Sequence, residues 1–305
     1  MLRGAMLYLA DQKALKRLLS GPLTRPLVSR FVAGENVDAA IAAIQQLNTR
    51  GMQATLDFLG ESVHSREAAS AAALQYIALL HAINRAGVSS HASLKLTQMG
   101  LDVDAELCQR NVERIVAQAQ SFNNFVRIDM EASNYTQQSL DMFQAIYAKY
   151  KNVGIVIQAY LYRSENDIHM LNTLGARVRL CKGAYNEPAD VAFPQKADTD
   201  NNFIKLMQLL LSEGNYPAIA THDERMINET MAYAQRHGIS AERFEFQMLY
   251  GVRRDLQARI IRDGYRLRIY VPYGEEWYPY LMRRMAERPA NLIFILSGVI
   301  REQRT

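Results

Sequence analysis

Two adjacent arginines near the end of the chain have the side-chain chemistry to bind a small carboxylate. Within residues 268–288, four side chains stand at positions i, i+3, i+4 and i+7: Tyr280, Arg283, Arg284 and Glu287. In a helix this spacing places all four on one face. A guanidinium offers a planar fork of donors that matches a carboxylate, and Glu287 can hold an arginine in place. From this segment alone, a solvated charged helix face explains the pattern equally well.

Further polar residues recur where short apolar runs end. They are Asp57, Lys95, Asp129, Glu131, Gln158, Tyr160, Arg179, Lys182, Thr221, His222, Asp223, Gln247 and Tyr270. If the runs are parallel strands of one barrel, their carboxyl ends meet at one face, and these side chains share a site. A surface strand would alternate its charges along its length, so we interpret these charges as clustered at the strand exits.

Several of these residues have structural alternatives. Lys95 is flanked by leucines, which is costly unless it faces a partner or an anion, although a lysine snorkelling at a strand edge also fits. Asp129 can orient a hydroxyl or a cation, or be a hydrogen-bonded structural aspartate. His222 can be a buried, hydrogen-bonded histidine. A metal site formed with Glu131 is weakly supported because no close histidine pair exists, and we expect no metal.

The segment 179–185, Arg-Leu-Cys-Lys-Gly-Ala-Tyr, predicts a strand that opens into a turn of small residues. Small residues allow a ligand to approach the backbone closely. Arg179 and Lys182 supply positive charge for a phosphate or for a reduced, electron-rich ring. A plain turn glycine at Gly183 is the alternative.

Eight apolar runs alternate with helical patterns and would position these side chains. The runs are 52–58, 93–96, 125–130, 153–160, 176–181, 218–221, 244–249 and 268–271. Alternating strands and helices indicate a parallel sheet with right-handed crossovers, and eight repeats in roughly 250 residues match an α/β chain with a closed (β/α)8 TIM barrel. An open doubly wound sheet is the second choice, because no G-x-G-x-x-G or G-x-x-x-x-G-K-[ST] follows a run.

Composition narrows the class of protein. With 305 residues, 49% hydrophobic and 22% charged, the chain is a folded globular protein. We expect extra N-terminal helices in residues 1–50 and a catalytic barrel in residues 51–305. A net charge of +4, spread along the chain, argues against a nucleic-acid partner. The two cysteines lack metal-ligand spacing and suit a cytoplasmic location, and any membrane contact is expected to be peripheral, at the inner face.

Five segments, in order along the chain, resemble one known family. They are Gln-Ala-Tyr (158–160), Arg-Leu-Cys-Lys-Gly-Ala-Tyr (179–185), Ala-Thr-His-Asp (220–223), Glu-Phe-Gln-Met-Leu-Tyr-Gly (245–251) and Tyr-Leu-Met-Arg-Arg-Met-Ala-Glu-Arg-Pro-Ala-Asn (280–291). They resemble the monofunctional bacterial proline dehydrogenases. The resemblance implies a distorted barrel with FAD at the strand C-termini. It also implies oxidation of L-proline to Δ1-pyrroline-5-carboxylate, the first step of proline catabolism, by hydride transfer from proline C5 to flavin N5, with electrons passed to a membrane quinone.

The resemblance also implies a substrate site of seven residues. Those that would hold the proline carboxylate are Lys95, Arg283 and Arg284. Those that would shape the pocket for the ring are Leu249, Tyr270 and Tyr280. Glu287 would brace an arginine.

A second implied group of residues surrounds the cofactor. Asp129 would order the pocket around Tyr270, and Arg179 would contact the isoalloxazine and stabilise negative charge on the reduced flavin, so these two are the predicted catalytic residues. The other implied cofactor contacts are Met130, Gln158, Lys182, Gly183, Ala184, Tyr185, Thr221 and His222. Two positions depart from the family pattern: Cys181 stands where valine is more frequent, and Asp223 where asparagine is frequent.

Three alternative functions stay open. Hydroxyproline oxidation is one, since nothing excludes a ring hydroxyl beside Tyr280. Another FAD barrel, of the methylenetetrahydrofolate reductase type, would need folate and nicotinamide sites. A non-enzymatic basic barrel that binds an anionic partner would be colourless when purified.

Overall fold

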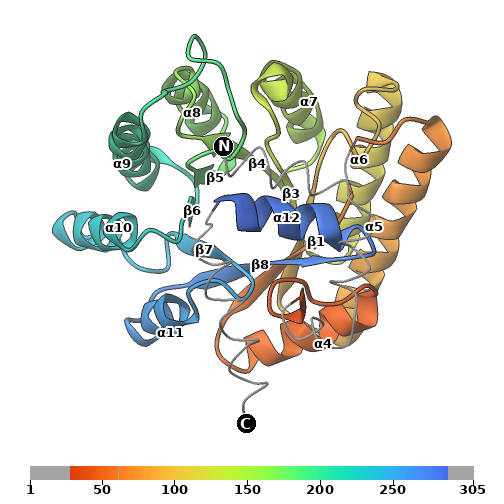
Figure 1. Cartoon of the computed structure of the whole chain (residues 1–305), viewed down its shortest axis with the longest axis horizontal. Coiled ribbons are helices and arrows are strands. Elements are labelled where there is room, and N and C mark those ends of the chain that lie inside the picture. The colour runs from red at the N-terminus through yellow and green to blue at the C-terminus, as the bar shows by residue number, and fades with distance from the viewer. Residues whose placement is uncertain (1–27, 61, 288–305) are drawn as a thin grey trace.

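The computed structural model describes residues 28–60 and 62–287, and eight parallel strands close into a barrel within them (Figure 1). The strands are β1 Gln53–Phe58, β2 Ser90–Leu94, β3 Val126–Ile128, β4 Val153–Gln158, β5 Arg177–Cys181, β6 Ala218–Ala220, β7 Glu245–Leu249 and β8 Leu267–Tyr273. Each pairs with its neighbours in sequence, and β1 closes on β8 with Thr55 opposite Tyr270. All eight predicted strands and the predicted barrel are confirmed. The largest shift is at β2, which ends at Leu94, so Lys95 follows the strand.

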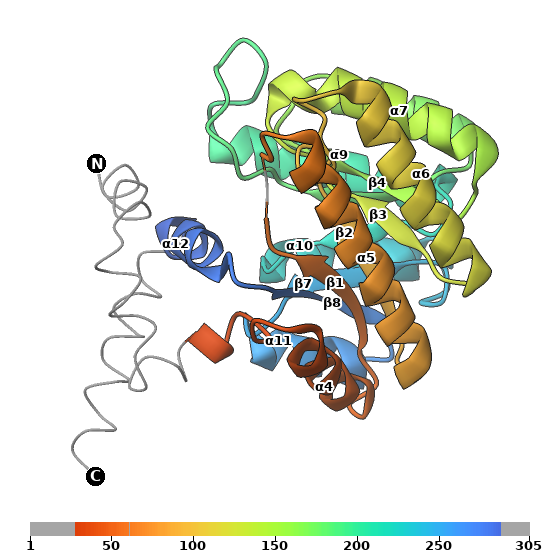
Figure 2. The same ribbon diagram turned by 90° about the vertical axis from the view of Figure 1, so that its right-hand side faces the viewer.

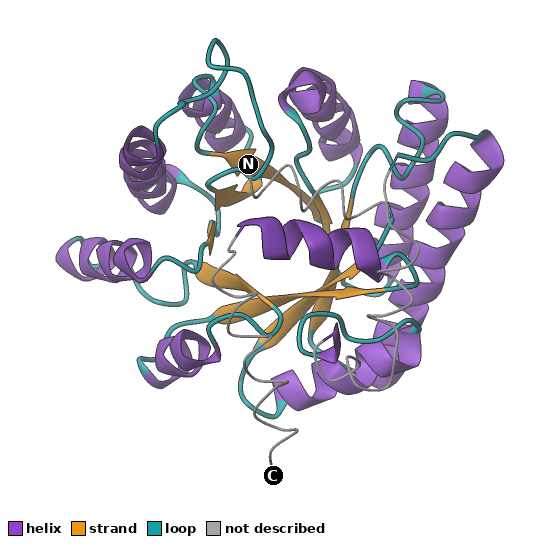
Figure 3. Ribbon diagram, in the orientation of Figure 1, coloured by secondary structure: helices purple, strands orange, loops and turns teal. Residues whose placement is uncertain are grey.

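Seven helices form most of the outer wall (Figure 3). They are α5 Arg66–Ala86, α6 Ala105–Ser121, α7 Thr136–Lys149, α8 Ser164–Thr173, α9 Lys196–Glu213, α10 Glu224–Arg236 and α11 Arg254–Arg262, with a 3-10 turn, η1 Ser133–Tyr135, before α7. The helix ends follow from local chemistry. Ser65 and Asp104 cap α5 and α6 by accepting backbone N–H bonds, and Gly87 ends α5 with φ of 61°.

The two faces of most strands differ in polarity. Apolar residues on the outer face, such as Leu56, Ile128 and Phe246, pack with the helices in one core and are at most 1% exposed. Polar residues on the other face form hydrogen bonds between strands that are not neighbours, for example from Tyr270 on β8 to Asp129 beyond β3. Such bonds place these side chains inside the barrel.

Charged residues also lie well before the strand exits, inside the barrel. Arg268 Nε donates to Glu245 Oε1 at 2.8 Å, and the same guanidinium donates to the carbonyl of Ala54. Arg127 donates from inside the barrel to the carbonyl of Ile155. Charged residues therefore stand at the strand exits, as expected, and also deeper along the strands, which was not expected. The charged residues alternate along the strands because inward-facing polar groups can form hydrogen bonds with one another inside the closed barrel. This interior is unusual, since branched apolar residues fill most barrels of this type.

Two helices make the barrel irregular. α4 (Val37–Asn48) packs on the outside against β1, β8 and α5, and it confirms an N-terminal helix before the barrel. α12 (Trp277–Glu287) follows β8 but lies across the barrel mouth, at the carboxyl ends of the strands (Figures 1 and 2). α4 therefore occupies the outer position that the eighth helix of a regular barrel would take. Predicted helices within residues 1–27 lie outside the described residues, and the boundary at residue 50 stays a prediction.

α12 is held over the mouth by its first turn and by the segment before α4. Trp277 Nε1 donates to Glu35 Oε1 at 3.0 Å. Its buried side packs Trp277, Tyr280 and Leu281 against Val32 and Leu59. No helix of the described residues is long and apolar enough to span a bilayer.

Candidate active site

The carboxylate of Asp129 is the centre of a hydrogen-bond network inside the barrel mouth. Its Oδ1 accepts from Ser93 Oγ at 2.6 Å and from a guanidinium nitrogen of Arg179 at 2.7 Å. Its Oδ2 accepts from the Tyr270 hydroxyl at 2.8 Å. The guanidinium carbon of Arg179 also lies 5.3 Å from the centroid of the Tyr270 ring, in cation–π contact. One carboxylate thus joins four strands or strand ends, β2, β3, β5 and β8.

The electrostatics of this network keep its hydrogen bonds intact. Burial, with a contribution from the charge of Asp129, raises the pKa of Tyr270 well above its ordinary value. The phenol therefore stays protonated at neutral pH and donates its hydrogen bond to Asp129. The side chains of Arg179 and Asp129 are 7% and 12% exposed, so each neutralises a charge that would be costly alone.

Lys95 points to a second buried carboxylate. Its Nζ lies 3.4 Å from both carboxylate oxygens of Asp57, which also accepts from the Tyr76 hydroxyl at 3.4 Å. Asp57 is 1% exposed, and burial raises its pKa although the charge of Lys95 acts in the opposite direction. The lysine therefore does not only snorkel at a strand edge. Its ammonium is positioned inside the barrel mouth, with a carboxylate behind it.

Two buried polar atoms in the barrel mouth have no hydrogen-bond partner among the described residues. They are Arg179 Nε, a donor, and Gln158 Oε1, an acceptor. The other end of the Gln158 amide donates to the carbonyl of Met130 at 3.5 Å, and Met130 itself is 6% exposed. Buried polar atoms are nearly always paired. This pair therefore suits a bound group that offers an acceptor to Arg179 and a donor to Gln158.

A group of two lysines and two aspartates lies beside the exits of β5 and β6. Lys182 Nζ donates to Asp200 Oδ1 at 2.5 Å and to Asp223 Oδ2 at 2.8 Å, and Lys196 donates to the other oxygen of Asp200. Burial alone would raise the pKa of Asp200, but the hydrogen bonds from the two lysines bring it below its usual value. Lys182 thus reaches the predicted cofactor region with its charge already balanced.

The departure at Asp223 has a structural consequence. Its Oδ1 accepts from the backbone of Arg225 at 3.1 Å and caps α10, while Oδ2 binds Lys182. An asparagine at this position would keep the cap but would not carry the charge that pairs with the lysine.

The turn after β5 is shaped by Tyr160. Gly183 has φ of 109°, and a Cβ there would lie 2.4 Å from the Tyr160 ring. Glycine is thus required here by the protein itself, and a cofactor contact at Gly183 and Ala184 stays a prediction. Tyr185 follows with 38% exposure.

His222 and Thr221 are fixed by local bonds at the exit of β6. His222 Nε2 accepts from the backbone N–H of Leu249 at 2.8 Å, which assigns the proton of the neutral ring to Nδ1. Thr221 Oγ1 accepts from the backbone of Asp223. Glu131 accepts from the Thr97 hydroxyl at 2.9 Å, and the described residues contain no group of three or more ligating side chains that could hold an ion.

The predicted carboxylate site is described only in part. Tyr280 is 7% exposed in the cluster under α12, and Leu249 is half-buried at the end of β7. The helix that carries Arg283, Arg284 and Glu287 lies across the mouth, but those three side chains lie outside the described residues. Their roles stay predictions.

Comparison with known proteins gives the family. The model of the proline dehydrogenase family matches residues 40–296. The chain belongs to the proline dehydrogenase family. It is 41% identical over 300 residues to proline dehydrogenase 2 of Bacillus subtilis, covering 98% of this chain and 99% of that protein. It is 40% identical over 304 residues to proline dehydrogenase of Deinococcus radiodurans, covering 98% of each.

A solved structure agrees with the fold of this proline dehydrogenase. Proline utilization A from Bdellovibrio bacteriovorus superposes with a TM-score of 0.81 at 27% identity, covering 86% of this chain and 32% of that chain. The chain thus spans about a third of that protein. The activity of the present chain is proline dehydrogenation, the first step of proline catabolism. The proline dehydrogenase family is flavin-dependent.

Three residues of this proline dehydrogenase site were not predicted from the sequence. Ser93 donates to Asp129, and for Ser93 a signal exists, because it stands two residues before Lys95. Asp57, which was expected among the residues at the strand exits, accepts from Lys95. Asp200 comes from a helix and carries no local signal. Glu187 belongs to the loop between β5 and α9.

Glu187 fastens that loop to two others of the proline dehydrogenase barrel. Its carboxylate accepts from the backbone of Ser133 at 2.8 Å, from the Ser133 hydroxyl, and from the Tyr160 hydroxyl at 3.2 Å. A bridge between Leu161 and Ala192 adds a second attachment. The loop that carries Gly183 and Tyr185 is therefore anchored by the Glu187 carboxylate near its middle and by this bridge near its end.

Proposed function

We propose that FAD is the flavin of this enzyme, that it binds at the carboxyl ends of the strands, and that a quinone is the electron acceptor. When bound, FAD would supply the acceptor for the hydride from C5 of L-proline. As that hydride leaves, the C5–N double bond would form, and the nitrogen would release its proton to solvent to give Δ1-pyrroline-5-carboxylate. The protein then has to hold proline with its amine neutral and C5 toward the flavin.

The observation that carries this proposal is the pair of unpartnered atoms, Arg179 Nε and Gln158 Oε1. An isoalloxazine ring edge presents both acceptors and an N–H donor, so its chemistry fits this donor set. Arg179 is already fixed by its bond to Asp129. It can therefore stabilise negative charge on the ring without reorganising. Met130 and the residues 182–185, 221 and 222 are the other proposed contacts.

The substrate part of the proposal rests on charge and on a fixed phenol. Lys95 is the described cation that would meet the carboxylate, together with Arg283 and Arg284 from α12. Tyr270 cannot swing freely, because its hydroxyl is bound to Asp129. Its ring can thus form a rigid side of the proline pocket, beside Leu249 and Tyr280, with Glu287 bracing an arginine.

The identity of the cofactor is tested by releasing the flavin with acid and separating it by chromatography. We expect FAD at one per chain, whereas FMN or no flavin would refute this part. The variant Gln158→Met keeps side-chain length and removes the amide, so it should lose flavin faster on dialysis. Gln137→Met, at an exposed position on α7, is the matched control and should retain it.

The acceptor is tested with the loaded enzyme and L-proline. A short-chain quinone should support faster turnover than oxygen. Equal rates with both would refute the quinone proposal while leaving the cofactor assignment intact. We also propose that this exchange takes place at the inner face of the membrane, by peripheral contact from the cytoplasm.

A further inference from the structure

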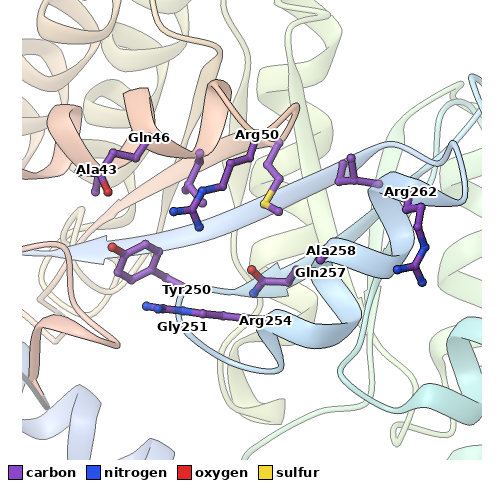
Figure 4. Close-up of a pocket in the computed structure, with 12 residues that line it drawn as sticks. Ala43, Gln46, Arg50, Tyr250, Gly251, Arg254, Gln257, Ala258 and Arg262 are labelled. Carbon is purple, nitrogen blue, oxygen red and sulfur yellow. The ribbon is translucent and has the colours of Figure 1, made fainter.

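A groove on the outer wall of the barrel lies between α4 and α11 (Figure 4). Its cavity volume is about 380 Å³, at the lower end of the range for small-molecule sites. The groove lies where α4 and α11 both pack beside β8, whereas α12 lies over the mouth and does not cover this wall. It is thus a consequence of the irregular barrel.

The floor of the groove is apolar. Its apolar lining consists of Ala43, Leu47, Met52, Ala258 and Ile261. Leu47 and Met52 are 6% and 7% exposed and belong to the main core. An apolar group of a ligand would replace water there, which is favourable in proportion to the area covered.

The rim of the groove is basic. Arg50, Arg254 and Arg262 line it, and no acidic side chain is among the described residues that do. Neither Arg50 nor Arg254 forms a salt bridge within the described part of the chain, whereas Arg262 lies 3.9 Å from Asp263. Figure 4 shows Arg50 and Arg254 on the same side of the groove as the Tyr250 ring, with Arg262 at the other end. Two guanidiniums beside one ring suit an acid group.

The loop side of the groove is held in place before any ligand arrives. The Gln257 amide donates to the carbonyls of Leu249 at 3.1 Å and of Val252 at 2.8 Å. These bonds fix the loop that carries Tyr250. A preformed site loses less entropy on binding.

We propose that this groove binds an anionic amphiphile, a medium-chain carboxylic acid with its acid group at Arg50 and Arg254 and its chain on the apolar floor. The acid group would accept hydrogen bonds from both guanidiniums. The chain would lie along α11 against Leu47 and Met52. This site is separate from the proline site, and the proposal does not rest on the identity of the flavin or of the acceptor.

The test is a calorimetric titration of the full-length holoenzyme with decanoate. We expect saturable binding at one site, with decanol and acetate each binding at least about tenfold more weakly, because each lacks one of the two matched groups. Arg50→Gln combined with Arg254→Gln should weaken decanoate binding by about tenfold or more. Arg110→Gln combined with Arg236→Gln, two exposed arginines elsewhere, should leave it unchanged.

A second variant guards against indirect effects of charge. Ala258→Phe, at an exposed helix position, would fill the groove and should abolish decanoate binding while proline turnover stays normal. Binding that survives Ala258→Phe or the double arginine variant would overturn the proposal. So would binding to anionic vesicles without binding to free decanoate, since that would indicate a charged surface instead of a cavity.

Discussion

The Tyr270 hydroxyl donates a 2.8 Å hydrogen bond to Oδ2 of Asp129 and so connects β8 to the end of β3 across the barrel. The other oxygen of the same carboxylate is taken by Ser93 and Arg179. Asp129 therefore orders one aromatic and one cationic side chain at once. The proposed ring pocket and the proposed flavin contact share this one carboxylate.

Replacing the two ends of this bond should have unequal effects on stability. Asp129→Ala leaves Arg179 buried without its carboxylate and should lower the free energy of unfolding by about 3 to 5 kcal/mol. Tyr270→Phe removes one hydrogen bond and should cost about 1 kcal/mol. Urea unfolding of both variants measures the difference. Equal losses would show that the ion pair is not the dominant contact of Asp129.

The arginines of α12 should act on substrate binding. We expect Arg283→Met and Arg284→Met each to raise KM for proline at least about tenfold while the flavin stays bound, because a lost charge-assisted hydrogen bond costs about 1.5 to 3 kcal/mol. Arg110→Met, on the outer wall, should keep the wild-type KM. Unchanged proline kinetics in both α12 variants would remove the carboxylate assignment.

Glu187 should control the mobility of the loop between β5 and α9. Glu187→Ala removes all three hydrogen bonds from Ser133 and Tyr160. Amide hydrogen exchange in residues 183–193 should then speed up, with little change in the barrel strands. Asp190→Ala, an exposed position in the same loop, is the control and should exchange like the wild type. Similar exchange in the two variants would show that the loop is held elsewhere.

His91 should make the protein less stable in mild acid. Burial, followed by the charge of Arg268 and of other arginines inside the barrel, lowers the pKa of His91 well below 6.5. The folded state then binds fewer protons here than the unfolded chain does. The stability due to neutral His91 is complete above about pH 6.5 and is lost as the pH falls toward the folded pKa, by up to about 1.4 kcal/mol per pH unit.

The check is urea unfolding between about pH 7 and pH 5. His91→Gln should flatten this dependence, because the residue that titrates is gone. His237→Gln, at an exposed site, should keep the wild-type slope. An unchanged slope in His91→Gln would assign the acid sensitivity to other groups.

The barrel could be predicted because its strands are buried on their outer face and bounded by helical patterns. Runs such as 153–157 are continuously apolar, which is typical of parallel strands. The position of α12 could not be predicted in the same way. Its polar and apolar residues follow a helical period whether the helix lies on the outer wall or over the mouth.

The candidate site could be predicted less fully than the fold. The alternation of residues along a strand does contain a signal for the inward-facing side chains. Arg127 and Asp129 form one pair two residues apart, and Glu245 and Gln247 form another, as side chains on the same face must. The partners of these side chains come from distant segments. Asp200, which binds Lys182, is an ordinary helix residue in the sequence, and only the fold brings the two together.

We expect this barrel to oxidise L-proline with a bound flavin. The most direct measurement is the visible absorption spectrum of the purified protein before and after anaerobic addition of L-proline, with trans-4-hydroxy-L-proline as a parallel sample. We predict a yellow protein whose flavin absorption bleaches with L-proline and bleaches more slowly with the hydroxylated compound. A colourless protein, or a flavin spectrum that L-proline leaves unchanged, would contradict the account.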